Sequence, residues 1–173
     1  MGRIDKHGDN VSSDAEMLAL SEGRLFRVYD KQSIPAVGAT GHLEYAIVTG
    51  DKHVHIRPLN FNTSADKMDV VFYEDSVLTG GDEVTTKNYN RDLKYPSVTK
   101  FYRAPTVTSD GTEFSAGYVP GSTGVGGTRS GSDVTGALKY VLKPNTKYLW
   151  RFTNGSSAAN TVFWSFAFEE VDE

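Results

Sequence analysis

Two histidines separated by one residue are the clearest lead to chemistry in this sequence. His53 and His55 flank Val54, and side chains at positions i and i+2 of a strand point to the same side of a sheet. Such a pair can grip one metal ion when further ligands join it. Asn60 and Phe61 stand where an acid would be useful, and no histidine follows His55. We therefore predict no metal site and read these histidines as solvent-facing.

A glycine-rich segment and a carboxylate pair are the other candidates for chemistry. Residues 121–128 read GSTGVGGT, which has the glycine spacing of a phosphate loop but places Gly127 where the phosphate-binding Lys should stand. Glu169 and Glu170 adjoin each other near the end of an apolar run, and we interpret them as a solvated strand end. With so few histidines, no Ser, His and Asp arrangement emerges. We predict no catalytic or cofactor-binding residues, no cofactor and no enzymatic activity.

Composition narrows the function classes further. The 173 residues carry a formal charge of −4, from 18 Lys and Arg against 22 Asp and Glu, and they include no Cys. No long run of one charge sign favours nucleic acid or an anionic membrane. The absence of Cys excludes a disulfide scaffold. No apolar run approaches the roughly 20 residues that span a bilayer, so we expect a soluble product with neither nucleic acid nor membrane as partner.

The elements that must position these residues are strands. Alternation places Tyr148, Trp150 and Phe152 on one face of a strand. A second run, joined to the first through residues 154–160, shares a face among Val162, Trp164, Phe166 and Phe168. We predict that these two aromatic faces meet in a hairpin and fill the core between two sheets.

Turn chemistry predicts three more hairpins. A turn at Gly50-Asp51 would pair Ile47 with Val54 and set His55 opposite Ala46, with His42 too far along the strand to join a histidine cluster. Turns at Asp110-Gly111 and Gly80-Gly81 would pair Val107 with Phe114 and Val77 with Val84. Further strands are expected at residues 25–30, 68–74 and 137–142, so the total reaches about nine or ten.

Two segments do not follow the strand pattern. Residues 1–22 read as an N-terminal arm, in which the capping-box spacing of Ser13 and Glu16 favours one short helix carrying Met17, Leu18 and Leu20. Residues 117–136 contain seven glycines and are expected to form a long surface loop. The rest of residues 23–173 makes one domain. We predict an all-β antiparallel sandwich with jelly-roll topology, and a closed barrel is the alternative.

Exposed aromatic rings keep a binding function open. Tyr89, Tyr95, Tyr102 and Tyr118 lie in or beside polar segments, and rings on a flat sheet face can stack against sugars. A carbohydrate-binding module is therefore an alternative to a structural role.

The closing unit carries a family resemblance. Residues 142–170, LKPNTKYLWRFTNGSSAANTVFWSFAFEE, resemble the C-terminal hairpin of small β-sandwich virion proteins from tailed bacteriophages. The segments LFRVYDKQSIPA and LEYAIVTGDKHVHIRPL are similar in style. Such proteins include head decoration, or cement, proteins and some tail and fibre components. The alternative function that the resemblance implies is therefore a carbohydrate- or host-surface-binding module of a phage tail or fibre. The general arrangement is similar over residues 24–172, although the distinctive sequence motifs lie in roughly the last 30 residues.

The resemblance implies a structural role and no catalytic set. It implies a capsid decoration protein that binds the outside of a phage head as a homotrimer and clamps neighbouring capsomers. The implied partners are the major capsid protein and further copies of this chain. The implied location is the capsid exterior of a virion, after synthesis in the bacterial cytoplasm. An N-terminal arm that contacts a neighbouring subunit would fit this role.

Overall fold

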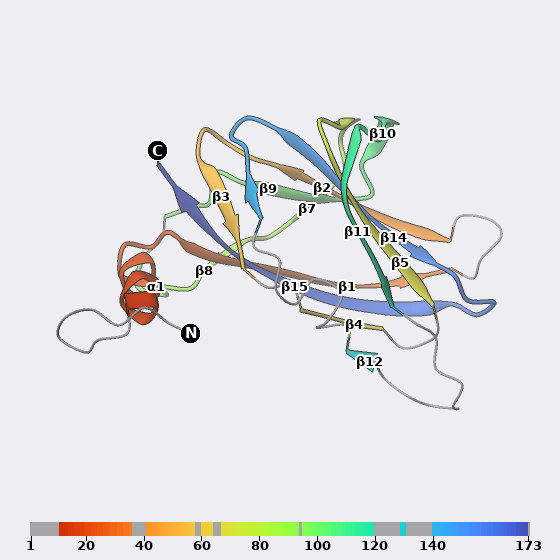
Figure 1. Cartoon of the computed structure of the whole chain (residues 1–173), viewed down its shortest axis with the longest axis horizontal. Coiled ribbons are helices and arrows are strands. Elements are labelled where there is room, and N and C mark those ends of the chain that lie inside the picture. The colour runs from red at the N-terminus through yellow and green to blue at the C-terminus, as the bar shows by residue number, and fades with distance from the viewer. Residues whose placement is uncertain are drawn as a thin grey trace.

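The computed structural model describes residues 11–35, 41–57, 60–63, 67–93, 95–119, 129–130 and 140–172. Within that part of the chain, almost all regular structure is strand (Figure 1). The elements are α1 (Val11–Ser21), β1 (Leu25–Ile34), β2 (His42–Val48), β3 (His53–Ile56), β4 (Asn60–Thr63), β5 (Met68–Glu74), β6 (Val77–Thr79), β7 (Asp82–Val84), β8 (Lys87–Asn88), β9 (Lys100–Arg103), β10 (Thr106–Ser109), β11 (Thr112–Val119), β12 (Arg129–Ser130), β13 (Val141–Leu142), β14 (Lys147–Asn154) and β15 (Asn160–Val171). No helix in these ranges is long and apolar enough to cross a bilayer.

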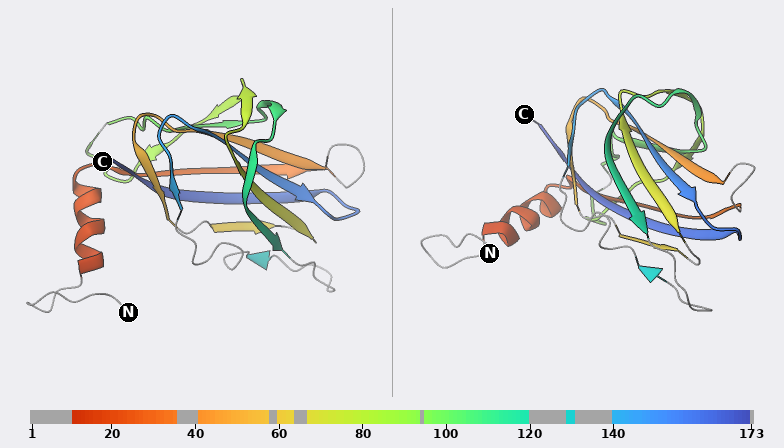
Figure 2. Two further views of the ribbon diagram at one scale, coloured as in Figure 1. Left: turned by 45° about the horizontal axis from the view of Figure 1, so that its top comes forward. Right: turned by 45° about the vertical axis from the view of Figure 1, so that its right-hand side comes forward.

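The strands form two antiparallel sheets and a small ribbon. The first sheet has the order β12-β4-β15-β1-β8, with β3 pairing β15 beyond β4 and β13 pairing β3. The second has the order β11-β5-β14-β2-β9-β7. The ribbon joins β6 to β10. The two large sheets face each other in Figure 2, so the predicted all-β sandwich is confirmed.

The pairing order is that of a jelly roll. The first long strand β1 pairs with the last, β15, and β2 pairs with the penultimate β14. Each of these pairs then gains a strand from the middle of the chain, β4 beside β15 and β5 beside β14. β12 and β11 complete the two sheets. In this order β1, β2, β4 and β5 alternate between the two sheets, and β11 returns beside β5, as in a jelly roll. The described strands therefore form a two-sheet sandwich and not the alternative closed barrel.

Aromatic rings fill the space between the sheets. Trp150, Trp164 and Phe166 have no exposed surface, which confirms them as core. The two indoles meet edge to face with ring centroids 4.9 Å apart, although β14 and β15 belong to different sheets. The predicted hairpin between these strands is therefore wrong, and their apolar faces meet across the sandwich. Each strand is central in its own sheet, which is why both can bury one full face.

The hairpin predicted at Gly50-Asp51 is also wrong, because its two strands lie in different sheets. After β2 the chain crosses to the first sheet, so Ile47 pairs with Tyr148 and Phe101, whereas Val54 pairs with Leu142 and Glu170. The bend at Gly50 is held by the distant turn that precedes β14, because the N–H of Asn145 donates to the carbonyl of Gly50 at 2.6 Å.

The two glycine turns are present, but the strands beside them diverge. Gly80, Gly81 and Gly111 all have positive φ, as a tight turn requires. β6 and β10 pair with each other, β7 pairs with β9, and β11 pairs with β5. The turn residues therefore predicted where the chain reverses and not which strand it meets.

The segments outside the sandwich are partly described. α1 spans Val11–Ser21, so Ser13 lies within the helix and not at the N-cap position that its spacing to Glu16 predicted. The predicted glycine-rich loop begins too early, since β11 continues to Val119. Residues 1–10 of the arm, most of the loop including the 121–128 segment, and residues 137–139 of the expected strand lie outside the described residues.

Candidate interaction surface

Exposed apolar side chains gather at the α1 end of the sandwich. Of nine large apolar side chains that are exposed in the described residues, five lie there: Met17, Leu18, Tyr89, Tyr95 and Val98. Met17 and Tyr89 line one groove, and Tyr95 and Val98 line a second pocket beside Gly23. We call these five residues the helix-end surface. Clustering of this kind marks a contact site on a protein more often than scattered exposure does.

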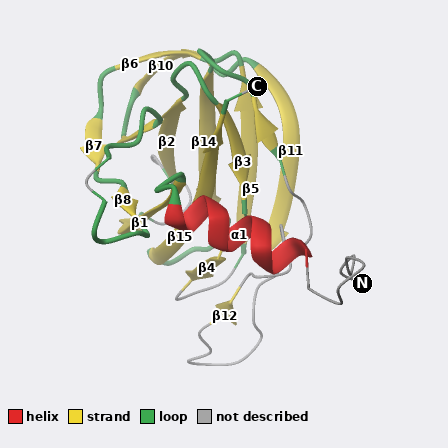
Figure 3. Cartoon of the chain, turned by 90° about the vertical axis from the view of Figure 1, so that its left-hand side faces the viewer, coloured by secondary structure: helices red, strands yellow, loops and turns green. Residues whose placement is uncertain are grey.

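The helix is fixed to the sandwich by its C-terminal cap. The N–H of Arg24 donates to the carbonyl of Ala19 at 2.9 Å, and the N–H of Gly23 donates to that of Leu20 at 3.1 Å. This is a Schellman motif, with Gly23 supplying the positive φ of 70° that it requires. The side chain of Asn88 donates to the carbonyl of Gly23 at 2.7 Å. α1 therefore presents its exposed side chains at a defined position across the end of the sandwich (Figure 3).

A cluster of charges secures the first residues after the helix. Arg24 binds Glu22 at 2.6 Å and also pairs with Glu169. The hydrogen bond to Glu22, with the attraction of Glu169, raises the pKa of Arg24 above its ordinary value, so this side chain stays charged. Glu169 also accepts from Arg57 at 3.1 Å. The charges hold the start of β1 against the end of β15.

The predicted solvated carboxylate pair is wrong. Glu170 is only 4% exposed, and it accepts from the Ser97 hydroxyl at 2.7 Å and from the Thr99 N–H at 2.8 Å. A buried carboxylate has to be hydrogen-bonded in this way, because desolvation without partners is costly. Its effect is to tie down residues 95–99, which carry Tyr95 and Val98 of the helix-end surface.

A groove of about 470 Å³ separates α1 from the first sheet. Its lining is mainly apolar, from Met17, Leu20, Leu25 and Ala167, with Tyr89, Glu16 and Arg57 also contributing. The groove is a concave apolar surface, and the exposed apolar side chains of α1 project beside it at the same end of the molecule. Such a shape suits another protein chain better than a small polar substrate.

The structure separates the histidines. His53 and His55 lie on β3 in the first sheet, and His42 lies on β2 in the second. His55 stands opposite Glu169 and Val141, so the register that placed it opposite Ala46 is wrong. The described residues contain no group of three His, Cys, Asp or Glu side chains that could hold a metal ion.

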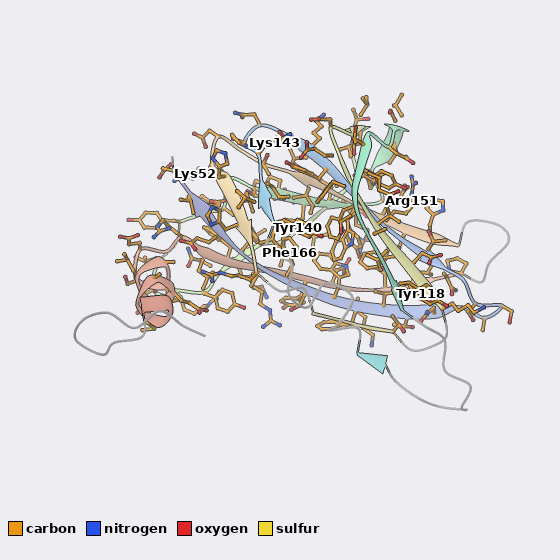
Figure 4. All side chains as sticks on the ribbon, viewed as in Figure 1. Lys52, Tyr118, Tyr140, Lys143, Arg151 and Phe166 are labelled. Carbon is orange, nitrogen blue, oxygen red and sulfur yellow. The ribbon has the colours of Figure 1, made fainter. Side chains whose placement is uncertain are left out.

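The four tyrosines do not share one face. Tyr89 and Tyr95 are 40% and 63% exposed at the helix end, whereas Tyr118 is 49% exposed on the edge strand β11. Figure 4 shows Tyr118 far from α1. Tyr102 is half-buried on β9, beside the β6–β10 ribbon. The tyrosines therefore do not form a single platform for a sugar.

Sequence reasoning named Met17, Leu18, Tyr89 and Tyr95, wrongly assigned Glu170 to solvent, and did not name Val98. A signal for Glu170 was present, because the period-two alternation that buries Phe166 and Phe168 also places residue 170 on the inner face. Nothing local pointed to the approach of residues 88–98 to α1, since that contact depends on where β8 pairs with β1.

Comparison with known proteins adds little to this surface. No protein-family model matches the chain, and no curated protein matches it. One similar solved structure is that of the infectious bursal disease virus VP2 subviral particle, at 15% identity and a TM-score of 0.21. The match covers 87% of this chain and 42% of that chain, so this chain spans less than half of the VP2 chain. A likeness this weak carries no argument about function.

Proposed function

We propose that this chain is a structural virion protein, specifically a decoration or cement protein on the outside of a phage head. The observation that carries the proposal is the helix-end surface: a rigid, ring-filled sandwich presents clustered apolar side chains at one end. The resemblance of residues 142–170 to phage virion proteins supplies the biological setting. The proposed partners are the major capsid protein and two further copies of this chain.

The physical task of a cement protein is to add many weak contacts over a lattice. A trimer that binds the shell through each subunit multiplies modest single affinities through avidity, so each contact can be small. A body that does not deform transmits those contacts between neighbouring capsomers. The cross-sheet aromatic packing described above provides such a body, and no catalytic step is part of this role.

The test is occupancy on purified heads that lack the protein. We expect that deleting residues 1–22 leaves a folded domain but strongly reduces binding to heads in a sedimentation assay. Leu18→Ser and Tyr95→Ser should each weaken binding at unchanged thermal stability. Tyr118→Ser is the matched control, since Tyr118 is comparably exposed but lies on β11.

Antibody labelling of intact particles places the protein independently. Label over the outer surface of heads is expected. Label confined to tails, or unchanged head occupancy after the deletion, would reject the proposed role. The tail result would instead favour the host-surface-binding alternative.

A further inference from the structure

The outer face of the first sheet carries a row of cations next to the α1 groove. Along β1, Arg27, Tyr29 and Lys31 are exposed, whereas Val28 is buried. Side chains two residues apart on a strand point to the same face, so these three lie on the solvent side of the sheet. β8 adds Lys87, which is exposed and stands directly opposite Arg27. We call Arg27, Tyr29, Lys31 and Lys87 the basic row.

The cations of the basic row have no carboxylate partner in the described part of the chain. Arg27 donates to the Ser165 hydroxyl at 3.3 Å, and Lys87 donates to the Tyr29 hydroxyl at 2.9 Å. Glu169 lies on the same face of the sheet, but its carboxylate already accepts from two arginines at the helix end. In a chain whose formal charge is −4, this face therefore presents positive charge that is not neutralised.

Two of these charges repel each other in the free protein. Arg27 and Lys87 face each other on neighbouring strands, and like charges at such positions are unfavourable. The Arg27 Cζ and the Lys87 Nζ lie 5.6 Å and 5.0 Å from the centroid of the Tyr29 ring. The negative face of the ring attracts both cations but does not neutralise them. A bound carboxylate would relieve the repulsion.

The basic row continues directly from the α1 groove. Leu25 and Tyr89 line that groove, and they lie two residues along the chain from Arg27 and Lys87 respectively. Ala167, which also lines the groove, stands opposite Arg27. Figure 3 shows β1 and β8 beside α1. A chain that fills the groove can therefore extend over the cations without leaving the surface.

The carboxylates of a protein segment suit this surface better than nucleic acid or a sugar. Binding of duplex DNA rests on many phosphate contacts at once, whereas the basic row offers three cations. A sugar would stack on the ring of Tyr29, but Arg27 and Lys87 already lie over it. Arginine binds a carboxylate through two parallel hydrogen bonds, and the adjoining groove favours a ligand that carries apolar side chains as well.

We propose that Arg27, Lys31 and Lys87 bind the carboxylates of an acidic segment of a partner protein, whose apolar residues enter the α1 groove. The inference rests on the proposed function in one respect: that function supplies a protein partner for the helix end. The inference adds the chemistry of the partner, which carries Asp or Glu side chains next to apolar ones. It also gives a role to the outer face of the first sheet.

A synthetic peptide tests the site in solution, without any capsid. The probe is a fluorescein-labelled peptide of two leucines followed by six glutamates, and the same peptide with glutamines in place of the glutamates is its control. In fluorescence anisotropy at low salt, wild type should bind the glutamate peptide and not the glutamine peptide. Arg27→Glu and Lys87→Glu should each raise the dissociation constant about tenfold, because the reversed charge repels the carboxylates.

Lys67→Glu is the matched control, because Lys67 is exposed just before β5 of the second sheet and its reversal changes the net charge equally. This variant should bind the peptide as wild type does. An equal loss of affinity in Lys67→Glu and Arg27→Glu would show attraction by net charge alone and would overturn the proposed site. Thermal melts check that every variant is folded.

Two other polyanions distinguish the class of ligand. Heparin and a single-stranded oligothymidylate are measured in the same assay. Binding of either one, together with no binding of the glutamate peptide, would overturn the assignment to an acidic protein segment.

Head occupancy is measured separately, so this inference and the proposed function can fail independently. Peptide binding that depends on Arg27 and Lys87, with no binding to heads, would support the site and reject the cement role. Head binding that is equal for wild type and both charge variants, with no peptide binding, would overturn the site and leave the cement role standing.

Discussion

Removing one ring from the sandwich interior gives the sharpest test of how this chain is held together. Phe166 has no exposed surface and packs against Phe101, with ring centroids 5.6 Å apart, and against Trp150 at 6.1 Å. Phe166→Ala removes the ring and leaves a cavity between two sheets that are each pinned by hydrogen bonds. A buried Phe→Ala change costs about 3–5 kcal/mol of unfolding free energy, a large share of the roughly 5–15 kcal/mol that typical proteins have.

Phe163 is the matched control because it lies on the same strand and points to the opposite face. It is only half-buried, so Phe163→Ala should cost about 1–2 kcal/mol. In urea titrations followed by tryptophan fluorescence, the Phe166 variant should lose about 2 M in midpoint if m is about 2 kcal/mol/M. Equal midpoint losses for the two variants would show that the inner face of β15 contributes no more to stability than its outer face. The conclusion that this face fills the core between two sheets would then be wrong.

Three further substitutions test two polar contacts and the backbone conformation of one glycine turn. Glu170→Ala should lower the free energy of unfolding by about 3 kcal/mol, because it leaves buried hydrogen-bond donors without an acceptor. Amide hydrogen exchange in residues 95–99 should become faster. Arg151 donates two hydrogen bonds of 2.7 Å to Asp110, and this contact lowers the pKa of Asp110 below its ordinary value. The pair therefore stabilises the fold above about pH 4 and loses its effect as pH falls through the lowered value, so the melting-temperature gap between wild type and Arg151→Gln should narrow in acid. Gly111→Ala should destabilise far more than Gly80→Ala in thermal melts, because both have positive φ but an added Cβ would lie 2.2 Å from a backbone oxygen only at Gly111.

Much of the fold was accessible from local pattern. Alternating apolar residues predicted the strands at 25–30 and 68–74, and the structure has β1 at Leu25–Ile34 and β5 at Met68–Glu74. The same alternation predicted the buried face of β15 correctly from Val162 to Phe168. Period-two patterning works for β15 and for most of β1 and β5, because these strands bury mainly one face. β2 and β14 depart from it, since Ala46 and Leu149 on their outer faces are buried as well.

Strand pairing was not accessible in the same way. A turn such as Asp110-Gly111 indicates that the chain reverses. The pairing partner that is nearest in the sequence is then the next strand. In this protein the two strands beside the turn diverge. Asp110 instead accepts a hydrogen bond from Arg151 of β14, which is distant in the sequence. Pairing is a competition among all strands for buried area, which no window of a few residues contains.

The amino-acid sequence by itself determined that this chain is all-β, which side chains are interior, and where the chain turns, because these depend on spacing within single strands. Only the tertiary structure decided that β14 and β15 face each other across two sheets, that Ser97 and Thr99 donate to Glu170, and that apolar side chains gather around α1. Those features arise where segments distant in the chain meet, so their energies depend on contacts that exist only after the sheets have packed.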